Sequence, residues 1–375
     1  MKILHIDNSP AVTGAYKALY SWCVQHPEWE HVWILPEGSA VAAEVAGKFK
    51  VYQLPFVEIG KSPARILGYL PALWRNGKRF KAILQSEQPR LVHANDLYNL
   101  LPYTARRLKG IRLPLVVHAR MLQQSFPAPI YRFWKNWHIN RADGIVAVSQ
   151  AIKQDWDNSD KVQVIYDPIA ITEKWPPYRF TYREGEPFRF LYLANYIAGK
   201  GQDDALQSIR LLKARGVTGF TVDFYGGTTG LAKNEAYKKM LGAYAQEHGL
   251  SDIVAFHGPV QDVEAVMKQY HALLHFSHAE SFGMVCYEAL YYGMPVISSN
   301  CGGPAEMIAD GRSGYLLPLR DIAAYADAMQ NFIALPGLAQ EFSEHAPGYL
   351  NQQVPNDAAL LGRFFEQTIK RVGNE

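Results

Sequence analysis

The chain has 375 residues, of which 48% are hydrophobic and 19% charged, and its formal net charge is +3. This length suits two domains of about 150 to 200 residues, and the composition excludes a largely disordered protein. The small net charge gives no support for nucleic-acid binding by the whole molecule. The chain starts directly with a predicted strand and has no apolar run of membrane-spanning length. The three cysteines, Cys23, Cys286 and Cys301, fit no disulfide or zinc pattern and favour a cytoplasmic compartment.

Short apolar strands alternate with helical patterns in the first half of the chain. The predicted strands are 2–6, 31–35, 51–54, 90–93, 115–118, 144–148 and 162–165, and the predicted helices are 14–25, 97–108, 130–141 and 150–156. Strands that are apolar nearly throughout are typical of a parallel sheet covered on both faces. The alternation therefore predicts a doubly wound α/β domain over residues 1–170.

A stretch with four prolines and mixed charges, residues 167–188, interrupts this alternation. We expect the interdomain linker there, at 171–187, and a second doubly wound domain over 188–350. The strands predicted for it are 190–194, 221–225, 253–256, 273–276, 295–298 and 315–317. An amphipathic helix is predicted at about 357–372.

The most informative stretch, ESFGMVCYEALYYGMPVISSNCGGPAEMI, covers residues 280–308. It places Glu280 and Glu288 eight positions apart, around a Ser-Phe-Gly turn that opens a predicted helix. Eight positions are a little over two helical turns, so both carboxylates are expected to face one cleft. The backbone N–H groups of Phe282, Gly283 and Met284 at the helix start predict an anion site. Such a combination suits an enzyme that handles a nucleotide sugar.

This stretch resembles the signature of the retaining GT-B glycosyltransferases of family 4, also called glycosyl transferases group 1. The resemblance implies two doubly wound Rossmann-like domains with an interdomain cleft. The acceptor would bind to the first domain and the nucleotide sugar to the second. In this family the C-terminal helix, about 357–372 here, packs back on the first domain.

The resemblance also implies a retaining, metal-independent hexosyltransferase-type enzyme. It would move a sugar from a UDP- or GDP-sugar to a glycan, glycolipid or lipid-linked acceptor, in cell-surface polysaccharide or glycolipid biosynthesis. No cofactor is expected, because the nucleotide sugar is a substrate. Two alternatives stay open: a catalytically degenerate GT-B module that only binds sugar nucleotides, and a GT-B nucleotide-sugar epimerase.

The family's roles carry over to matching positions. Glu280 would position the donor sugar and stabilise positive charge at the anomeric carbon, and Glu288 would accept hydrogen bonds from ribose hydroxyls. The turn at Phe282, Gly283 and Met284 would contact the sugar and the diphosphate. The structural alternatives are an acid favoured by the helix dipole at 280 and a solvated glutamate at 288.

A second motif, ANYIAGKGQDDAL, follows the first predicted strand of the second domain. Its Lys200-Gly201 pair matches the family's Lys-Gly, and Lys200 is predicted to act on the leaving diphosphate. The family's arginine position reads Asn195, which is predicted to line the donor site. Arg120 and Arg312 are candidates to supply the missing positive charge.

Further candidates lie at the ends of predicted strands, which meet at the ligand-binding edge of an open α/β sheet. Gly14 and Gly226, the latter followed by Gly227, resemble the family's glycine loops on the donor side. His118 ends a predicted strand, and the resemblance implies that it is a catalytic residue that contacts the sugar or the acceptor. Asp96 and Arg120 are candidate acceptor contacts.

The metal motifs are weak. Asp155 and Asp157 match the Asp-x-Asp pattern of metal-dependent transferases, but they lie in a polar helical segment that favours a solvated face. The twelve histidines show no helical His-x3-His pair with a third ligand. The sequence therefore predicts no metal site.

The segment 61–81 carries six basic residues and no acid, interleaved with apolar and aromatic residues. A similar mixture recurs at 130–141. Such segments can lie on an anionic lipid surface, so we hypothesise peripheral binding to the inner face of the cytoplasmic membrane. The alternatives are a basic outer helix face and a cationic groove for an acidic acceptor.

Overall fold

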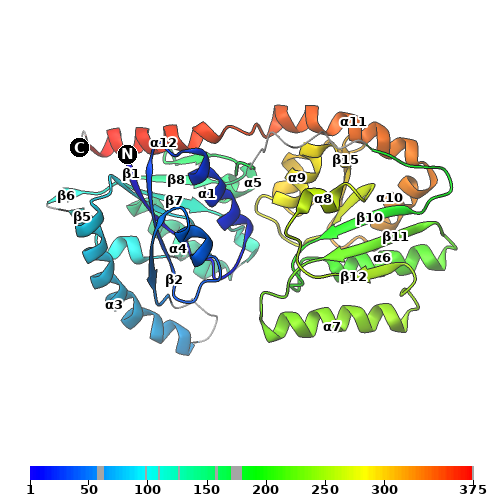
Figure 1. The fold of residues 1–375 in the computed structure, drawn as a ribbon, viewed down its shortest axis with the longest axis horizontal. Coiled ribbons are helices and arrows are strands. Elements are labelled where there is room, and N and C mark those ends of the chain that lie inside the picture. The colour runs from blue at the N-terminus through cyan, green and yellow to red at the C-terminus, as the bar shows by residue number, and fades with distance from the viewer. Residues whose placement is uncertain are drawn as a thin grey trace. The chain divides into compact units, whose positions relative to one another are not determined.

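The structure is a computed structural model that describes residues 1–56, 63–97, 99–108, 110–125, 127–156, 159–169 and 180–373. The chain divides into two compact units. Unit 1 comprises Met1–Ala170 and Asn356–Glu375, and unit 2 comprises Ile171–Pro355 (Figure 1). Residues 171–179 of the predicted linker lie outside the described residues.

Unit 1 is built on a parallel seven-stranded sheet with the order β3-β2-β1-β4-β7-β8-β9. The strands are β1 (Lys2–Ile6), β2 (Glu30–Pro36), β3 (Lys50–Leu54), β4 (Leu91–Ala94), β7 (Leu115–Ala119), β8 (Gly144–Ala147) and β9 (Val162–Val164). The helices are α1 (Gly14–Gln25), α2 (Ala42–Ala46), α3 (Pro63–Glu87), α4 (Ala128–Arg141) and α5 (Gln150–Asp155), with short 3₁₀ turns at Leu101–Thr104 and Gln123–Ser125. The strand order reverses beside β1, and open α/β sheets bind ligands at such a reversal, beyond the carboxyl ends of the strands.

One element of unit 1 differs from the prediction. The continuous helix expected over 97–108 is wrong: the chain forms the 3₁₀ turn Leu101–Thr104 and then an antiparallel hairpin, β5 (Arg107–Leu108) with β6 (Ile111–Arg112). Pro102 has no N–H to donate to a preceding carbonyl. The Asn99 side chain accepts a hydrogen bond from Leu101 N at 2.9 Å. This local bond replaces a helical backbone bond, so the segment turns.

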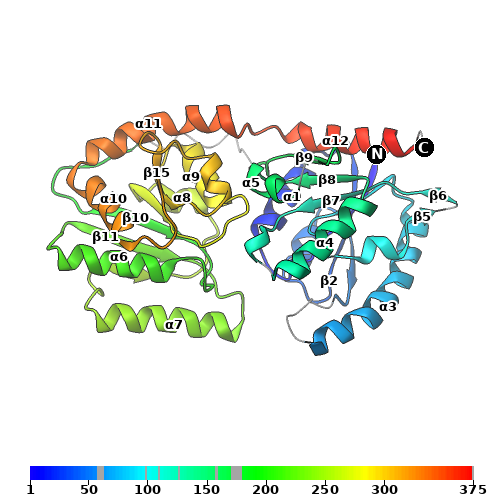
Figure 2. The ribbon, with the colours of Figure 1, turned by 180° about the vertical axis from the view of Figure 1, so that it is seen from behind.

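The C-terminal helix α12 (Ala358–Gly373) packs on the unit 1 sheet (Figure 2). Phe364 and Phe365 are buried in the same apolar cluster as Trp22 of α1. Trp22 Nε1 donates a hydrogen bond to the carbonyl oxygen of Ala358 at 2.8 Å. A Cβ atom on Gly144 of β8 would lie 2.8 Å from Phe364 Cζ, so the absence of a side chain there allows the close approach of helix to sheet.

Unit 2 is built on a parallel six-stranded sheet with the order β12-β11-β10-β13-β14-β15. The strands are β10 (Phe188–Leu193), β11 (Phe220–Tyr225), β12 (Val254–Phe256), β13 (Ala272–His275), β14 (Val296–Ser299) and β15 (Gly314–Leu317). The helices are α6 (Gln202–Ala214), α7 (Ala232–Glu247), α8 (Val263–Met267), α9 (Met284–Tyr292), α10 (Ile322–Ala334) and α11 (Pro336–Gln353). Among the described residues, no helix is both long and apolar enough to cross a membrane.

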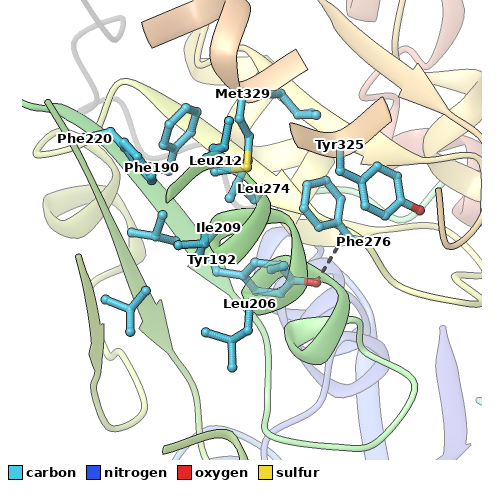
Figure 3. Close-up of a cluster of buried hydrophobic side chains, with 14 of the residues drawn as sticks. Phe190, Tyr192, Leu206, Ile209, Leu212, Phe220, Leu274, Phe276, Tyr325 and Met329 are labelled. Atoms are coloured by element: carbon cyan, nitrogen blue, oxygen red, sulfur yellow. Dashed lines mark hydrogen bonds between the residues drawn. The ribbon is translucent and has the colours of Figure 1, made fainter. Parts of the chain in front are cut away.

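The core of unit 2 fixes the strand end that carries the candidate site. Leu206 and Ile209 of α6 pack on Phe190 and Tyr192 of β10 within one buried cluster (Figure 3). The Tyr192 hydroxyl accepts a hydrogen bond from Phe276 N at 3.0 Å. Burying each such side chain contributes about 1.5–3 kcal/mol, so this cluster stabilises the pairing of β10 with β13.

Candidate active site

The loops after β13 and β14 hold Glu280 by its backbone. Glu280 forms an isolated parallel bridge with Gly302. Its N–H donates to the carbonyl oxygen of Cys301 at 2.9 Å, and its own carbonyl oxygen accepts from Gly303 N at 2.8 Å. A Cβ atom on Gly303 would lie 2.3 Å from the carbonyl oxygen of Phe282. The glycine pair of the motif therefore lets the two loops pack closely enough to fix Glu280.

The position of Glu280 corrects one argument from the sequence. Helix α9 begins at Met284, so Glu288 lies on the helix and Glu280 does not. The helical spacing that was expected to align the two carboxylates is therefore wrong. Glu280 is positioned instead by pairing with a loop more than twenty residues further along the chain, and helical periodicity does not describe such a contact.

Glu280 forms an ion pair with Lys200. Lys200 Nζ lies 2.6 Å from Glu280 Oε2, and the two side chains are 32% and 19% exposed. Burial alone would raise the pKa of Glu280, but the nearby Lys200 ammonium outweighs burial and the pKa is lowered. Burial alone would lower the pKa of Lys200, but the Glu280 carboxylate outweighs burial and the pKa is raised. Both groups are therefore charged at neutral pH.

His275 lies beside this ion pair. It ends β13, is 2% exposed, and its Nε2 lies 3.8 Å from Glu280 Oε2 without a hydrogen-bond partner. Burial, followed by the positive charge of Lys200, lowers the pKa of His275 to about 4, against the opposing effect of Glu280. The imidazole is therefore neutral at physiological pH. The sequence reasoning missed His275, although a histidine at the end of a predicted apolar strand was the available signal.

Gly201 and Tyr192 place Lys200 beside this carboxylate. Gly201 has φ +76°, and a Cβ atom there would lie 2.0 Å from the carbonyl oxygen of Phe276. Only glycine fits this contact. The Tyr192 hydroxyl donates to the carbonyl oxygen of Lys200 at 2.6 Å and accepts from Phe276 N. The Lys200-Gly201 pair therefore joins the loop after β10 to the end of β13.

The start of α9 offers backbone N–H groups near Glu280. Gly283 is the residue before the helix, has φ +93°, and has no side chain of its own to cap the first N–H groups. A Cβ atom on Gly283 would lie 3.4 Å from Glu280 Cγ. Phe282 is buried, whereas Met284 and Glu288 are half-buried on the helix. The helix has nine residues, so its dipole adds a partial positive charge at this end.

Asn195 and Gly226 lie at the ends of the neighbouring strands β10 and β11. Asn195 Oδ1 accepts a hydrogen bond from Gly227 N at 3.0 Å. A Cβ atom on Gly226 would lie 2.0 Å from the carbonyl oxygen of Ala194. Asn195 and Gly226 thus join the two loops, which is a structural role that the sequence did not predict. A role for either residue in donor binding stays a prediction.

The candidates in unit 1 occupy different settings. Gly14 is the exposed first residue of α1. Asp96 accepts a hydrogen bond from Leu97 N at 2.7 Å. Arg120 is largely buried, forms an ion pair with Asp167 and donates from Nε to Asn95 Oδ1 at 3.0 Å. Arg120 therefore already has a carboxylate partner, which weakens its candidacy as the missing cation. Arg312 is exposed, just before β15.

His118 lies near the carboxyl end of β7 and is 2% exposed. Its Nδ1 lies 2.5 Å from His93 Nε2. His93 is in turn in contact with His5, and His5 with His31, so His118 is the end of a row of buried imidazoles. The sequence analysis named only His118. The available signal for the other three was a histidine in each of the predicted strands 2–6, 31–35 and 90–93.

Two groups among the described residues have donor atoms close enough to hold a metal ion: His5 with Cys23 and His31, and Asp203 with Asp204 and His278. In the second group His278 Nε2 lies 2.9 Å from Asp204 Oδ2. Asp203 Oδ1 accepts a hydrogen bond from Tyr237 at 2.8 Å. The Asp-x-Asp pattern does not form a described site, because Asp155 accepts from Gln123 N and Asp157 lies outside the described residues.

Basic and aromatic side chains share the surface of unit 1 near α3 and α4. Trp74 is 65% exposed, and Lys78 Nζ lies 3.7 Å from the centre of its ring. A hollow is lined by Tyr103, Arg106, Arg112, Trp137, Asn140 and Arg141. Asp143 forms ion pairs with Arg106 and Arg112. Residues 61–62 of the basic segment lie outside the described residues, and so do the side chains of 63–68 and 70.

Two family models match the chain, one to each unit. A model described as glycosyl transferases group 1 matches residues 178–348, and one described as glycosyltransferase family 4 matches residues 28–173. Two Rossmann-like domains with parallel sheets define the GT-B class, and the predicted fold class is confirmed. The chain belongs to the group 1 glycosyltransferases of the family-4 type, and it is a transferase.

Individual relatives agree with this assignment. The chain is 28% identical over 286 residues to a lipopolysaccharide 1,6-galactosyltransferase of Escherichia coli K12, covering 72% of each chain. It is 35% identical over 120 residues to a D-inositol 3-phosphate glycosyltransferase of Streptomyces avermitilis, which covers 32% of this chain and 25% of that protein.

Solved structures share the fold. Anabaena Alr3699/HepE in complex with UDP and glucose matches with a TM-score of 0.77 at 20% identity, covering 100% of both chains. The apo form of the lipopolysaccharide outer core galactosyltransferase WaaB matches with a TM-score of 0.70 at 21% identity, covering 99% of both.

Proposed function

We propose that the protein is a retaining, metal-independent glycosyltransferase that binds a nucleotide sugar at the loops after β10 and β13. The observation that carries the proposal is the 2.6 Å Lys200–Glu280 ion pair beside the start of α9. It places a cation, a carboxylate and the backbone N–H groups of a helix start within one group of loops. A nucleotide-sugar donor needs all three, since its diphosphate is anionic and its anomeric carbon becomes positive during transfer.

The roles follow from how charge changes in the reaction. When the bond between the anomeric carbon and the diphosphate oxygen breaks, negative charge grows on the leaving group. Lys200 and the N–H groups at Gly283 and Met284 would stabilise that charge. Glu280 would oppose the positive charge at the anomeric carbon. Glu288 would accept hydrogen bonds from the ribose, because a carboxylate can take two hydroxyls at once. Phe282, Asn195 and Gly226 of unit 2 would line the donor, and a donor contact by Gly14 of unit 1 stays a prediction.

We propose a UDP-hexose as donor, with a GDP-sugar as the alternative. The support is that HepE is solved with UDP and with UDP-glucose, and that a relative is named a galactosyltransferase. A glycan or lipid-linked acceptor in cell-surface polysaccharide or glycolipid assembly is proposed on the same basis. His118, Asp96 and Arg120 would lie on the acceptor side.

One assay separates this function from its two alternatives. Each nucleotide sugar is incubated with and without a sugar-bearing lipid acceptor, and release of nucleoside diphosphate is measured with and without a chelator. We expect acceptor-dependent release that the chelator does not change, and a product that keeps the donor's anomeric configuration. A degenerate binding module would give no release, and an epimerase would convert the donor sugar without an acceptor. Inversion, or loss of activity with the chelator, would contradict the mechanism.

Peripheral attachment to the cytoplasmic face of a membrane is a separate part of the proposal. Its support is the exposed Trp74 next to Lys78 and the exposed Phe133 on the basic helix α4. An interfacial aromatic ring with nearby cations favours anionic lipid by about 1 kcal/mol for each cation. Vesicle flotation tests this: we expect co-flotation with anionic and not with neutral vesicles, and no co-flotation at low salt would rule it out.

A further inference from the structure

Four histidines form a diagonal row across the unit 1 sheet. They lie on the adjacent strands β2, β1, β4 and β7: His31, His5, His93 and His118. His5 pairs directly with His93, while His31 pairs with Ile3 and His93 with Val116. From one strand to the next, the histidine is therefore offset from its paired position by zero or two residues. Since side chains alternate between the two faces of a strand, an even offset keeps all four histidines on one face of the sheet. The row ends at the carboxyl side of β7.

The four rings form a continuous hydrogen-bonded chain. His31 Nε2 lies 3.0 Å from the carbonyl oxygen of His26. His31 Nδ1 lies 3.0 Å from His5 Nε2, His5 Nδ1 lies 3.0 Å from His93 Nδ1, and His93 Nε2 lies 2.5 Å from His118 Nδ1. All four side chains are at most 4% exposed, and Trp22 and Phe365 pack against rings in the row. Water therefore does not compete for these contacts.

The rings are neutral. Burial, followed by neighbouring charges that include the Arg120 guanidinium, lowers the pKa of His93 and His118 well below the ordinary value. Burial also lowers the pKa of His5 and of His31. Each neutral imidazole carries one N–H group, so the four rings together carry four.

Those four N–H groups are all assigned by the geometry. The His26 carbonyl oxygen only accepts, so His31 must donate from Nε2. His31 Nδ1 is then an acceptor, and His5 must donate from Nε2. His93 must donate from Nδ1 to His5, and His118 must donate from Nδ1 to His93. We infer that this row fixes the tautomer of His118, so that its Nε2 carries no hydrogen and accepts a hydrogen bond from a substrate hydroxyl. His5, His31 and His93 are positioning residues that act through His118.

The contact of His118 with a substrate hydroxyl rests on the proposed function, since the position of His118 near the end of its strand places it near the ligand. An acceptor nitrogen at this point favours a hydroxyl and disfavours a lone carbonyl oxygen, which could not donate to it. The chemical class recognised is thus the hydroxyl groups of a sugar, on the donor or on the acceptor.

Cys23 offers a competing arrangement. Its Sγ lies 3.6 Å from His5 Nε2, and the three donor atoms of His5, Cys23 and His31 are close enough for a metal ion. A metal would replace the proton between His5 and His31, so the tautomers of His5, His93 and His118 would reverse, while His31 would still donate from Nε2. Burial raises the pKa of the Cys23 thiol well above its ordinary value, which favours the thiol over the metal-binding thiolate. The 3.0 Å separation of the two ring nitrogens is that of a hydrogen bond.

The first test is ¹⁵N NMR of the ligand-free protein labelled at histidine, with His118 assigned by its loss in His118→Gln. We expect a protonated Nδ1 and an unprotonated Nε2 at neutral pH. Elemental analysis of the same sample should find no stoichiometric transition metal. A protonated Nε2, a doubly protonated ring, or one bound zinc per chain would overturn the inference. This test needs no activity and no variant beyond the assignment.

Variants at His31 test the control of the tautomer. In His31→Leu the acceptor for His5 is gone, while the Cys23 thiol can donate to His5 Nε2, so the row should reverse and His118 should become protonated at Nε2. His31→Asn can offer an oxygen near the position of Nδ1 and should restore the wild-type form. His26→Ala keeps the carbonyl oxygen that the row uses and is the matched control. An unchanged His118 signal in folded His31→Leu would overturn the role of the row.

The substrate contact is tested by adding UDP-glucose, UDP-galactose and GDP-mannose in turn, with and without a sugar-bearing lipid acceptor, while thermal stability reports binding. The His118 Nε2 signal should shift on formation of a complex, and kcat/KM should fall about tenfold in His31→Leu and recover in His31→Asn, as for one lost hydrogen bond. Binding without any shift of that signal would overturn the contact alone. Absence of binding by any donor would instead contradict the proposed function, and the ligand-free tautomer would still stand or fall by the first test.

Discussion

The two units position polar groups on their parallel sheets and the loops that follow by opposite means. Unit 2 uses charge: Lys200 Nζ and Glu280 Oε2 lie 2.6 Å apart, and each group keeps the other ionised against the cost of burial. Unit 1 uses neutral rings: its four histidines avoid charge and satisfy one another by hydrogen bonds. A charged pair suits groups whose charge changes during a reaction, whereas a neutral row suits recognition of hydroxyls. A parallel sheet can therefore support either a charged site or a neutral, hydrogen-bonded one.

Removing the carboxylate of unit 2 should have the largest effect. We expect Glu280→Gln to lower kcat by about 10²–10³, because one side chain that opposes transition-state charge contributes on that scale. The substitution keeps the size of the side chain. Steady-state transfer kinetics measure the loss, with Glu247→Gln, at an exposed site on α7, as control. Activity within a few-fold of wild type would remove Glu280 from the reaction.

Disrupting the close backbone contact that positions Lys200 should have the second-largest effect. Gly201→Ala would place a Cβ atom 2.0 Å from the carbonyl oxygen of Phe276, so we expect a loss of about 3 kcal/mol or more in the free energy of unfolding. Gly219 has the same φ of +76° with no atom within 4 Å, and Gly219→Ala should cost only about 1–2 kcal/mol. Urea unfolding of both variants separates the cost of the steric clash from the cost of the positive φ, because both glycines have the same φ. Equal losses would mean that the contact does not hold the loop.

The ion pair itself should give a smaller, pH-dependent effect. Lys200→Met should lower the free energy of unfolding at neutral pH by about 2 kcal/mol, between the values for exposed and buried pairs. Because the folded-state pKa of Glu280 is lowered, the contribution is present above the ordinary value of 4.5 and is lost as pH falls through the folded-state value. The folded-state pKa of Lys200 is raised, so the contribution of the ion pair is present below the ordinary pKa of 10.5. It is lost as the pH rises through the folded-state pKa. Unfolding curves taken at neutral pH, below 4.5 and above 10.5 measure this difference, and a difference independent of pH would contradict the pairing.

The surface of unit 1 should show the smallest effect. Trp74→Ser should weaken binding to anionic vesicles by about tenfold, since it removes an exposed ring from the interface. Transfer to a water-soluble acceptor and thermal stability should not change. Leu335 is also exposed, and Leu335→Ser in unit 2 is the control for a general loss of apolar surface. Equal weakening by both substitutions would contradict a specific lipid-facing surface.

The sequence was sufficient for the parts of this account that depend on local pattern. The strands of both sheets, the start of α9 and the family follow from apolar runs and from the motif over 280–308. The contacts between distant segments were not readable in the same way. Lys200 and Glu280 are eighty residues apart, and the bridge that holds Glu280 forms with Gly302 only once β13 and β14 are paired.

The histidine row shows the same limit more sharply. A histidine in each of four strands was visible, but the row exists because the strand order is β2-β1-β4-β7 and because each shift in register is even. Neither the order nor the register is encoded in spacing along the chain. The failed helix over 97–108 has a local cause, since Pro102 and the Asn99 side chain end the helical pattern that the apolar residues suggest.

The most direct test of the central claim is thermal stability with a panel of UDP-, GDP- and ADP-sugars, on wild type, Glu288→Ala and the control Glu247→Ala. A donor at 100 times its Kd should stabilise the protein by about 2.7 kcal/mol, a shift of roughly 5–10 °C in Tm. We predict that one nucleotide class gives this shift in wild type and in Glu247→Ala, and that Glu288→Ala abolishes it. No shift with any donor, or a shift that persists in Glu288→Ala, would contradict a donor site built on α9.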